Sequence, residues 1–284
     1  MAGLGILSLP QVLQNLIGWV KKDGRLLAWP IIVSSVMNVT SDEDGSDYED
    51  PYEFLDEDSD AESVAARLET LRKLKHLETL RKLEPATLAQ HADAIVARLE
   101  DSNEEVRCGT LEMLHKIEPA TLAQHADAIA ARLEDSNEEV RFRALPTLGK
   151  LEPATLAQHA DAVAAKLEDS DEEVRAVVLL TLGKLEPATL AQHAHAMVAK
   201  LEDFDGCVRL LALETLRKLE PATLAQHADA VAAKLEDDES GVRRIALDAL
   251  GDLEPATLAQ HAHTMVARLE DSDGCVRYMA LEKL

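Results

Sequence analysis

The sequence is poor in aromatic side chains, and its apolar runs are short. Phe, Trp and Tyr make up only 3% of the 284 residues, although 46% are hydrophobic. The core is therefore expected to consist of Leu, Ala and Val, a composition that favours helices over strands. The two apolar runs within residues 3–39 are shorter than the ~20 residues of a membrane-spanning helix, and no basic segment precedes them as in a secretory signal.

Basic side chains are scarce relative to acidic ones. The chain has 29 Lys and Arg against 53 Asp and Glu, which gives a formal net charge of −24. A strongly negative field repels phosphate, so nucleic acids and anionic membranes are disfavoured as partners. A protein with a basic surface fits better, although the charge can also serve solubility alone.

A repeat of 34 residues dominates the rest of the sequence. Glu-Pro recurs at this spacing six times, with the prolines at Pro85, Pro119, Pro153, Pro187, Pro221 and Pro255. We number the six units 1 to 6 from these prolines; unit 6 ends at Leu284. A fixed period of this size predicts one supersecondary unit stacked on copies of itself.

Each unit shows two amphipathic helical patterns. In unit 1 the expected buried face of the first helix is Leu88, Ala92, Ile95, Val96 and Leu99. That of the second helix is Val106, Thr110, Met113, Leu114 and Ile117. Neither face can be buried within one unit, so the helices should pair and the pairs should stack.

The helix starts are predicted from capping residues. Proline suits the first turn of the first helix, but Thr87 and Gln90 have the spacing of a capping box that would start it two residues later. Ser102 and Glu105 have the same spacing before the second helix. Pro146 falls inside the second helix of unit 2, where it is expected to kink the helix and remove one backbone hydrogen bond.

The second helices share the pattern D-x-x-x-x-V-R-x-x-A-x-x-x-L, as in the segment 203–216. This resembles the second helix of HEAT repeats, and the resemblance covers about 200 residues. It implies an all-α fold, a right-handed α-solenoid of stacked antiparallel helix pairs, with second helices on the concave side. It also implies hydrogen bonds between neighbouring units from the Asp and Arg of the pattern: Asp101, Arg107, Asp135, Arg141, Asp169, Arg175, Asp203, Arg209, Asp237, Arg243, Asp271 and Arg277.

No pattern of residues predicts an enzyme, a cofactor or a metal. P-loop, nucleophile-elbow and H-E-x-x-H motifs are absent, as are the His-Glu dipeptides of the HEAT-like di-iron hydroxylases. One histidine recurs in each unit, but equivalent atoms in stacked helices would lie ~10 Å apart. A structural histidine on the helix flank, beside Arg98 and its equivalents, is therefore expected. A HEAT-like bilin lyase stays open as an alternative function.

The second helices vary along one stripe, which we call the second-helix stripe. It comprises the residues two, six and nine positions after the Val of Val-Arg, expected opposite the core. A variable stripe with exposed apolar residues suits a partner-binding surface, although neutral drift would also produce variation. The predicted partner-binding residues are Phe142, Leu180, Leu210, Glu214, Arg244, Asp248, Tyr278 and Glu282.

The sequence before the repeats divides into three segments. Residues 1–40 are an apolar segment, which either resembles an F-box or forms a docking helix. Residues 41–60 are predicted to be an acidic linker. Residues 61–84 are predicted to be a degenerate capping unit before the repeats at 85–284. The main functional prediction is a non-enzymatic protein-binding scaffold. An F-box-like ubiquitin-ligase adaptor is the alternative.

Two further expectations concern the surface. The three cysteines are odd in number and form no C-x-x-C pair, and Cys207 and Cys275 stand two units apart, beyond disulfide reach. Free thiols predict a reducing compartment, cytoplasmic or nuclear. An apolar end face at unit 6 could also support self-association.

Overall fold

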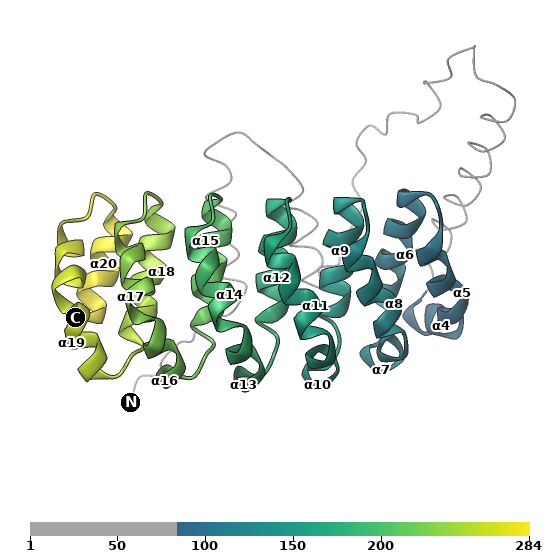
Figure 1. Ribbon diagram of the computed structural model, residues 1–284, viewed down its shortest axis with the longest axis horizontal. Coiled ribbons are helices and arrows are strands. Elements are labelled where there is room, and N and C mark those ends of the chain that lie inside the picture. Colours follow the sequence, from purple (N-terminus) through teal and green to yellow (C-terminus); the bar gives the residue numbers. More distant parts are fainter. Residues whose placement is uncertain (1–83) are drawn as a thin grey trace, which may run out of the picture. The chain divides into compact units, whose positions relative to one another are not determined.

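The computed structural model describes residues 84–284, which belong to one compact part of the chain, Asp60–Leu284. The apolar segment 1–40, the acidic linker 41–60 and the capping unit before Glu84 lie outside the described residues. Within residues 84–284 every regular element is a helix, and the helices recur with the sequence period (Figure 1). Among the described helices, none combines the length and the hydrophobicity that a membrane span requires.

The second helices of the six units are continuous α-helices. They are α6 (Glu104–Lys116), α9 (Glu138–Leu148), α12 (Glu172–Leu182), α15 (Gly206–Leu216), α18 (Ser240–Gly251) and α20 (Gly274–Lys283). Pro146 lies in the last turn of α9, and this helix continues to Leu148. Its length of 11 residues equals that of α12 and α15. A proline so near the helix end removes one backbone donor without ending the helix early.

In units 1 to 5 the first helix is interrupted, whereas the periodicity predicts a single continuous helix. It consists of α4 (Pro85–Gln90) and α5 (Ala92–Val96), α7 (Pro119–Leu122) and α8 (Ala126–Ala130), α10 (Pro153–Leu156) and α11 (Ala160–Ala165), α13 (Pro187–Leu190) and α14 (Ala194–Ala199), and α16 (Pro221–Leu224) and α17 (Ala228–Ala233). The break falls at the recurring histidine, whose φ is −112° at His91 and −117° at His125. In unit 6, α19 (Pro255–Ala267) runs without a break.

Short 3-10 helices fill the remaining turns of the first helices. Those that end them are η1 (Ala97–Glu100), η3 (Ala131–Glu134), η5 (Lys166–Glu168), η7 (Lys200–Glu202), η9 (Lys234–Glu236) and η10 (Arg268–Glu270). Those that carry the break are η2 (Ala123–His125), η4 (Ala157–His159), η6 (Ala191–His193) and η8 (Ala225–His227).

Both predicted capping boxes are wrong. The first helix of unit 1 starts at Pro85, because the backbone N–H groups of Thr87 and Leu88 both donate to the Glu84 carbonyl and so form its first turn. The second helix is capped one residue later than predicted, by Asn103, whose Oδ1 accepts from the N–H of Glu105 at 2.7 Å. An amide or carboxylate side chain at this position satisfies donors that the first turn leaves open.

The predicted helix faces form the core. Leu88, Ala92, Ile95 and Leu99 of the first helix are at most 5% exposed, and Val96 is half-buried. All five residues predicted for the second helix are at most 1% exposed. Equivalent leucines are buried in the inner units, so one core of aliphatic side chains runs through the stack.

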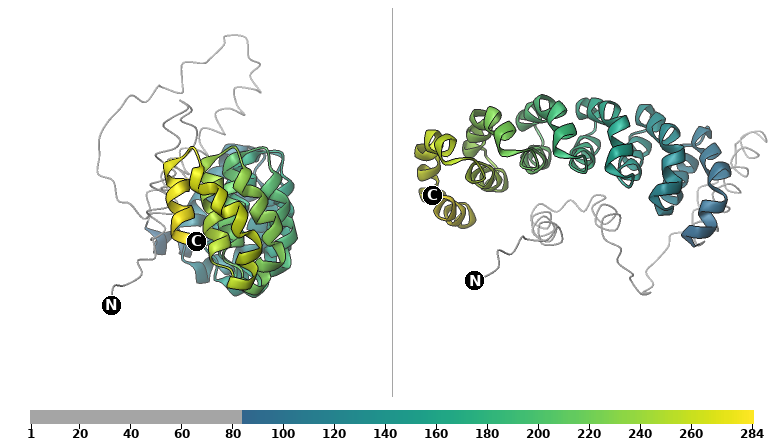
Figure 2. Two further views of the ribbon diagram at one scale, coloured as in Figure 1. Left: turned by 90° about the vertical axis from the view of Figure 1, so that its left-hand side faces the viewer. Right: turned by 90° about the horizontal axis from the view of Figure 1, so that it is seen from below.

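The second helices stack more closely than the first. Each packs along its length against the second helix of the next unit, from α6 on α9 to α18 on α20, whereas first helices of neighbouring units approach at fewer points. Closer spacing on one side bends a row of units toward that side. Figure 2 (right) shows this bend, with the second helices on the inner side of the arc.

Candidate protein-interaction surface

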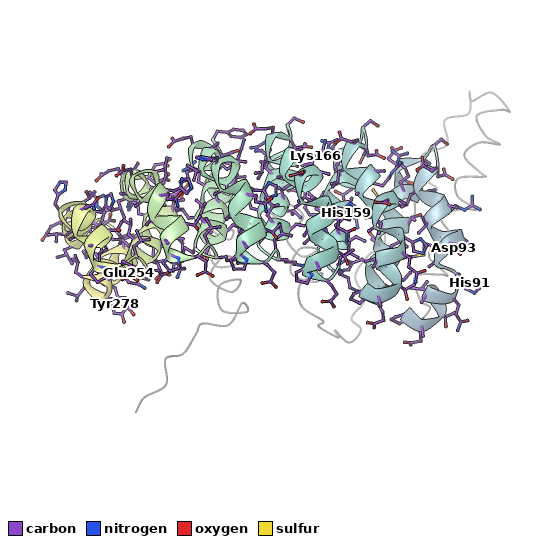
Figure 3. All side chains as sticks on the ribbon, turned by 60° about the horizontal axis from the view of Figure 1, so that its bottom comes forward. His91, Asp93, His159, Lys166, Glu254 and Tyr278 are labelled. Atoms are coloured by element: carbon purple, nitrogen blue, oxygen red, sulfur yellow. The ribbon has the colours of Figure 1, made fainter. Side chains whose placement is uncertain are left out.

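The second-helix stripe lies on the inner side of the row, because its residues point away from the buried face of each second helix. Most are half-buried in the narrow space between units, among them Leu180, Leu210, Glu214, Arg244 and Asp248. Tyr278 and Glu282 are exposed on α20. Figure 3 shows Tyr278 at the unit 6 end of the row.

Phe142 was expected to be an exposed aromatic of the stripe, and that prediction is wrong. Its side chain is only 5% exposed. Helix α9 packs against α6 on one side and α12 on the other, so a ring at this position lies between second helices. Phe142 therefore contributes to the core between units and offers little surface to a partner.

Phe204 is the exposed aromatic residue in the middle of the row. It is 79% exposed, in the loop before α15, and the guanidinium carbon of Arg175 lies 4.8 Å from its ring centroid. A cation–π contact of this kind is worth about 0.5–1 kcal/mol at an exposed site and orients the ring. The sequence placed Phe204 just before a second helix, but its exposure follows from the loop geometry alone.

Ion pairs occupy the stripe at its two ends. In units 1 and 2, Arg143 bonds to Glu112 of the preceding unit and lies 2.6 Å from Glu139. In the C-terminal units, Arg217 lies 2.6 Å from Asp248, which also pairs with Lys283 at 2.7 Å. Apart from Arg143–Glu139 within α9, these pairs span neighbouring units, and together they fix side chains along the stripe.

The centre of the stripe is apolar. Unit 3 contributes Ala176 and Leu180, and Leu210 follows in unit 4, all half-buried. Next to them, burial raises the pKa of Glu214, an effect that the charges of Arg217 and Arg244 oppose. The stripe therefore has an aliphatic centre between two charged ends.

Carboxylates crowd the N-terminal ends of the second helices in units 1 to 3. Burial raises the pKa of Glu173, and the negative charges of Asp171, Glu139 and Glu172 raise it further. Glu105 occupies the equivalent position in unit 1, whereas the equivalents in units 4 to 6 are Cys or Gly. A cation placed here would relieve the repulsion between carboxylates.

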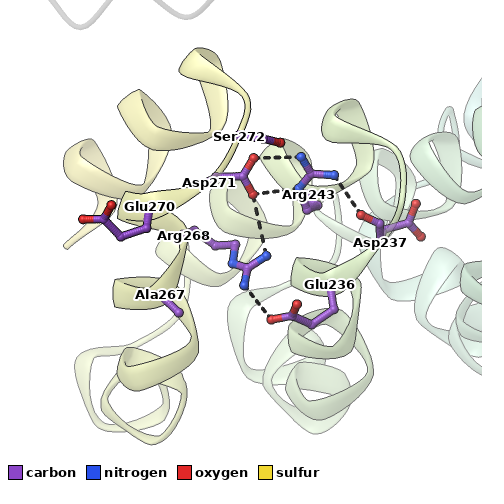
Figure 4. A pocket seen from close by; sticks show the side chains of 8 residues that line it. All are labelled: Glu236, Asp237, Arg243, Ala267, Arg268, Glu270, Asp271 and Ser272. Atoms are coloured by element: carbon purple, nitrogen blue, oxygen red, sulfur yellow. Dashed lines mark hydrogen bonds and ion pairs between the residues drawn. The ribbon is translucent and has the colours of Figure 1, made fainter.

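The Asp and Arg of the HEAT-like pattern meet between units. Arg107 donates from Nε and Nη2 to the two carboxylate oxygens of Asp135, both at 2.8 Å, and from Nη1 to the Asp101 carbonyl. The same two-bond pairing joins Arg141 to Asp169, Arg175 to Asp203, Arg209 to Asp237 and Arg243 to Asp271. Figure 4 shows the last of these. Arg277 donates to the carbonyls of Asp271 and Ser272 within unit 6.

A second set of contacts between units was missed from the sequence. A lysine after the second helix reaches back to the C-terminal carbonyls of the preceding second helix. Lys184 Nζ donates to the Gly149 carbonyl at 2.9 Å, and Lys218 Nζ to that of Gly183 at 2.7 Å. Burial lowers the pKa of both lysines. The recurring Gly-Lys-Leu was the available signal, because a glycine leaves room for the lysine.

A third set of ion pairs joins the first helices. In units 2 to 6, a basic residue near the end of the first helix binds a glutamate of the preceding unit, as in Lys200–Glu168 at 2.9 Å and Lys234–Glu202 at 2.8 Å. This glutamate stands two positions after the equivalent basic residue of its own unit. Arg132–Glu100, Lys166–Glu134 and Arg268–Glu236 repeat the contact. We call the contact region between two neighbouring units a joint. These ion pairs connect the units of each joint on the side of the first helices, opposite the second helices.

The recurring histidine also contacts the preceding unit, and it does so through an aspartate. His125 Nε2 lies 3.7 Å from Asp93, where the sequence had suggested Arg98 as its neighbour. Figure 3 labels Asp93 and, further along the row, His159 of unit 3. Residues 84–284 bring together no three His, Cys, Asp or Glu side chains as metal ligands. Cys108, Cys207 and Cys275 are all free thiols.

Solved structures of designed helical repeat proteins resemble this row of helix pairs. An engineered protein of the Northeast Structural Genomics Consortium is 16% identical, with a TM-score of 0.55 over 67% of this chain and 94% of that chain. The designed armadillo repeat protein YIII(Dq)4CqI is 15% identical, with a TM-score of 0.52 over 67% and 97%. The fold is an armadillo-type α-solenoid. Another designed armadillo repeat protein, solved in complex with the peptide (KR)4, is 14% identical, with a TM-score of 0.55 over 67% and 96%.

The sequence itself gives no further assignment. No protein-family model matches the chain, and no curated protein matches it. Identities of 14–16% support the shared fold only, so the helical solenoid stands, and the HEAT type of its repeats stays a proposal.

Proposed function

We propose that this α-solenoid, with HEAT-type repeats, is a non-enzymatic scaffold that binds an extended, positively charged protein segment along the inner side of its second helices. The observation that carries the proposal is the second-helix stripe. It changes from unit to unit, whereas the contacts that hold the units together recur almost unchanged. Variation concentrated on one side of the second helices suits recognition of successive side chains of a partner.

The charge distribution supports a basic partner. The net charge of −24 attracts cations at long range, and the crowded carboxylates around Glu173 provide a local site for them. The aliphatic centre at Leu180 and Leu210 would receive apolar side chains of the same segment. A designed armadillo repeat protein of similar fold was solved with (KR)4, a basic peptide, which makes this class of ligand a reasonable first probe.

Fluorescence anisotropy with a labelled peptide of alternating Lys and Arg tests the proposal. We expect binding that weakens steeply with salt, because exposed charges are screened at ~10 Å in 0.1 M salt. The triple variant Glu105→Gln, Glu139→Gln and Glu173→Gln should weaken binding at least tenfold. Leu180→Ala with Leu210→Ala should weaken it for a segment that alternates basic and apolar residues.

A matched control removes the same three charges elsewhere. Glu118, Glu152 and Glu186 precede the first helices, are exposed, and make no side-chain cap hydrogen bond. Their change to Gln should leave affinity within about twofold. Equal weakening by both triple variants would mean that only net charge matters, and absence of binding by wild type would remove basic segments as the partner class.

A further inference from the structure

The histidine contacts between first helices are alike at four of the five joints between units. At these four joints, the histidine of one unit lies against an aspartate of the preceding unit. In its own unit, this aspartate stands two positions after the histidine. The Nε2–Oδ1 distances are 3.7 Å for His125–Asp93, 3.8 Å for His159–Asp127, 3.9 Å for His193–Asp161 and 3.8 Å for His261–Asp229. A proton on any of these rings meets a carboxylate across the joint.

The joint between units 4 and 5 differs. Unit 4 carries His195 where units 1, 2, 3 and 5 carry Asp, so His227 of unit 5 faces another imidazole. The ring centroids lie 5.2 Å apart at an interplanar angle of 85°, an edge-to-face contact. Two neutral imidazoles pack favourably in this way, whereas two protonated rings at this distance repel each other.

The surrounding charges do not replace the missing carboxylate. Burial lowers the pKa of His227, and the charge of His195 lowers it further. The aspartates that contact or lie on these two helices face other joints: Asp161 of α11 lies against His193, and Asp229 of α17 lies against His261.

Several other charged groups of this joint form ion pairs. Lys234 binds Glu202 between the first helices at 2.8 Å. Between α15 and α18, Arg209 binds Asp237 at 2.8 Å and Asp238 at 2.7 Å, and Arg217 binds Asp248 at 2.6 Å. Glu214 of α15, whose pKa is raised by burial, also faces Arg217 and Arg244 in this joint. The histidine pair is the contact that distinguishes this joint from the other four.

We propose that the joint between units 4 and 5 is a built-in pH-sensitive hinge, which loosens when His195 and His227 are both protonated while the other four joints stay closed. The folded protein holds a proton on His227 less tightly than the unfolded chain does. The stabilising effect of the neutral pair is therefore present above about pH 6.5, the ordinary histidine value, and is lost as pH falls below it. Loosening one joint changes the path of the inner side between Leu210 and Arg244.

Hydrogen exchange measured by mass spectrometry tests this joint against its neighbours. Full-length protein is compared at pH 7.5 and 5.5, with exchange times scaled for the intrinsic pH effect. At pH 5.5 we expect peptides from α14 and α17 to exchange two- to fivefold faster relative to α11, the size of effect that exposed charge pairs produce. Equal ratios at the two pH values would overturn the proposal.

The repeat supplies two matched variants. His195→Asp restores the contact found at the other joints, and the pH dependence of exchange at α14 and α17 should disappear. Asp161→His builds a second histidine pair opposite His193, and the joint between units 3 and 4 should become acid-sensitive. Persistence of the effect in His195→Asp, or no new effect in Asp161→His, would show that the histidine pair is not its cause.

Discussion

At the scale of single residues, the joints between units depend on a few buried polar contacts. The arginine of each Arg–Asp pair uses three nitrogens, two for a carboxylate in the next unit and one for carbonyls in its own. A buried carboxylate with two such bonds is satisfied, whereas a buried guanidinium without its carboxylate is costly. The aspartates therefore contribute far more than the many exposed carboxylates around them.

Asp169→Asn should lower the free energy of unfolding by about 2 kcal/mol, because Arg141 loses its carboxylate in a buried joint. Glu168→Gln, one residue away and 74% exposed, should change it by less than about 0.5 kcal/mol. Urea denaturation at pH 7 measures both. Similar losses in the two variants would contradict this ranking.

The contribution of Asp169 to the free energy of unfolding should also depend on pH. Burial by itself would raise the pKa of Asp169, but hydrogen bonds from Arg141 and from the backbone N–H of Asp171 bring it below its usual value. Its contribution is thus present above about pH 4 and is lost as pH falls through the lowered pKa. The difference between wild type and Asp169→Asn should shrink below pH 4.

The cysteines are expected to differ in reactivity because they differ in burial. Burial raises the pKa of Cys108 and of Cys207 to about 11, whereas Cys275 is exposed. Since the thiolate is the reactive form, iodoacetamide at pH 8 should modify Cys275 at least ~10 times faster than the other two. Peptide mass spectrometry over time measures the three rates. In concentrated urea the three should react alike, and equal rates in the folded protein would contradict the prediction.

At the scale of the element, each second helix begins with the same capping arrangement, with one exception. Asn103, Asn137, Asp171, Asp205 and Asp273 cap their helices through the side chain, whereas Glu239 before α18 makes no such bond. A glutamate is one methylene longer than an aspartate and is not among the favoured cap residues.

Asn137→Ala should lower the free energy of unfolding by about 1 kcal/mol, and Glu239→Asp should raise it by about 0.5–1 kcal/mol, because each changes one helix cap. Ser136→Ala is the control, since the carbonyl of Ser136 accepts from Arg141 and its hydroxyl does not cap α9. Thermal and urea denaturation measure all three. A larger loss of unfolding free energy in Ser136→Ala than in Asn137→Ala would show that Ser136, and not Asn137, caps α9.

At the scale of the whole molecule, each unit of the described row contacts only its neighbours, so stability grows with the number of joints. The end face of unit 6 packs against no further unit among the described residues. Leu281 is 70% exposed there, whereas its equivalents Leu213 and Leu247 are completely buried. Tyr278, 67% exposed, lies on the same helix.

Removing residues 255–284 should leave units 1 to 5 folded, with a midpoint of thermal unfolding several degrees lower, because one joint is lost and the others are unchanged. Leu247 would then take the exposed position that Leu281 has now. Circular dichroism at 222 nm measures helix content and the midpoint. Loss of most helix content would show that the row folds only as a whole.

The repeat period and the helix faces were predictable because they depend on local pattern. Spacing of aliphatic residues identified Leu88, Ile95 and Met113 as buried, and the Asp and Arg of the pattern do meet across each joint. The cap was misplaced by one residue, since Ser102 and Asn103 are both good capping residues and only backbone geometry distinguishes them. Phe142 was misplaced because its burial depends on the distance between α9 and its neighbours.

The amino-acid sequence by itself determined that the protein is a stack of helix pairs, because a 34-residue module repeated six times leaves an apolar face that only another copy can cover. Tertiary structure decided which residues meet across each joint. The pairing of His227 with His195, the lysines on the glycine carbonyls and the burial of Phe142 all join residues of different units. Such contacts depend on the rotation and spacing of one unit relative to the next, and the pattern within a unit does not specify these quantities.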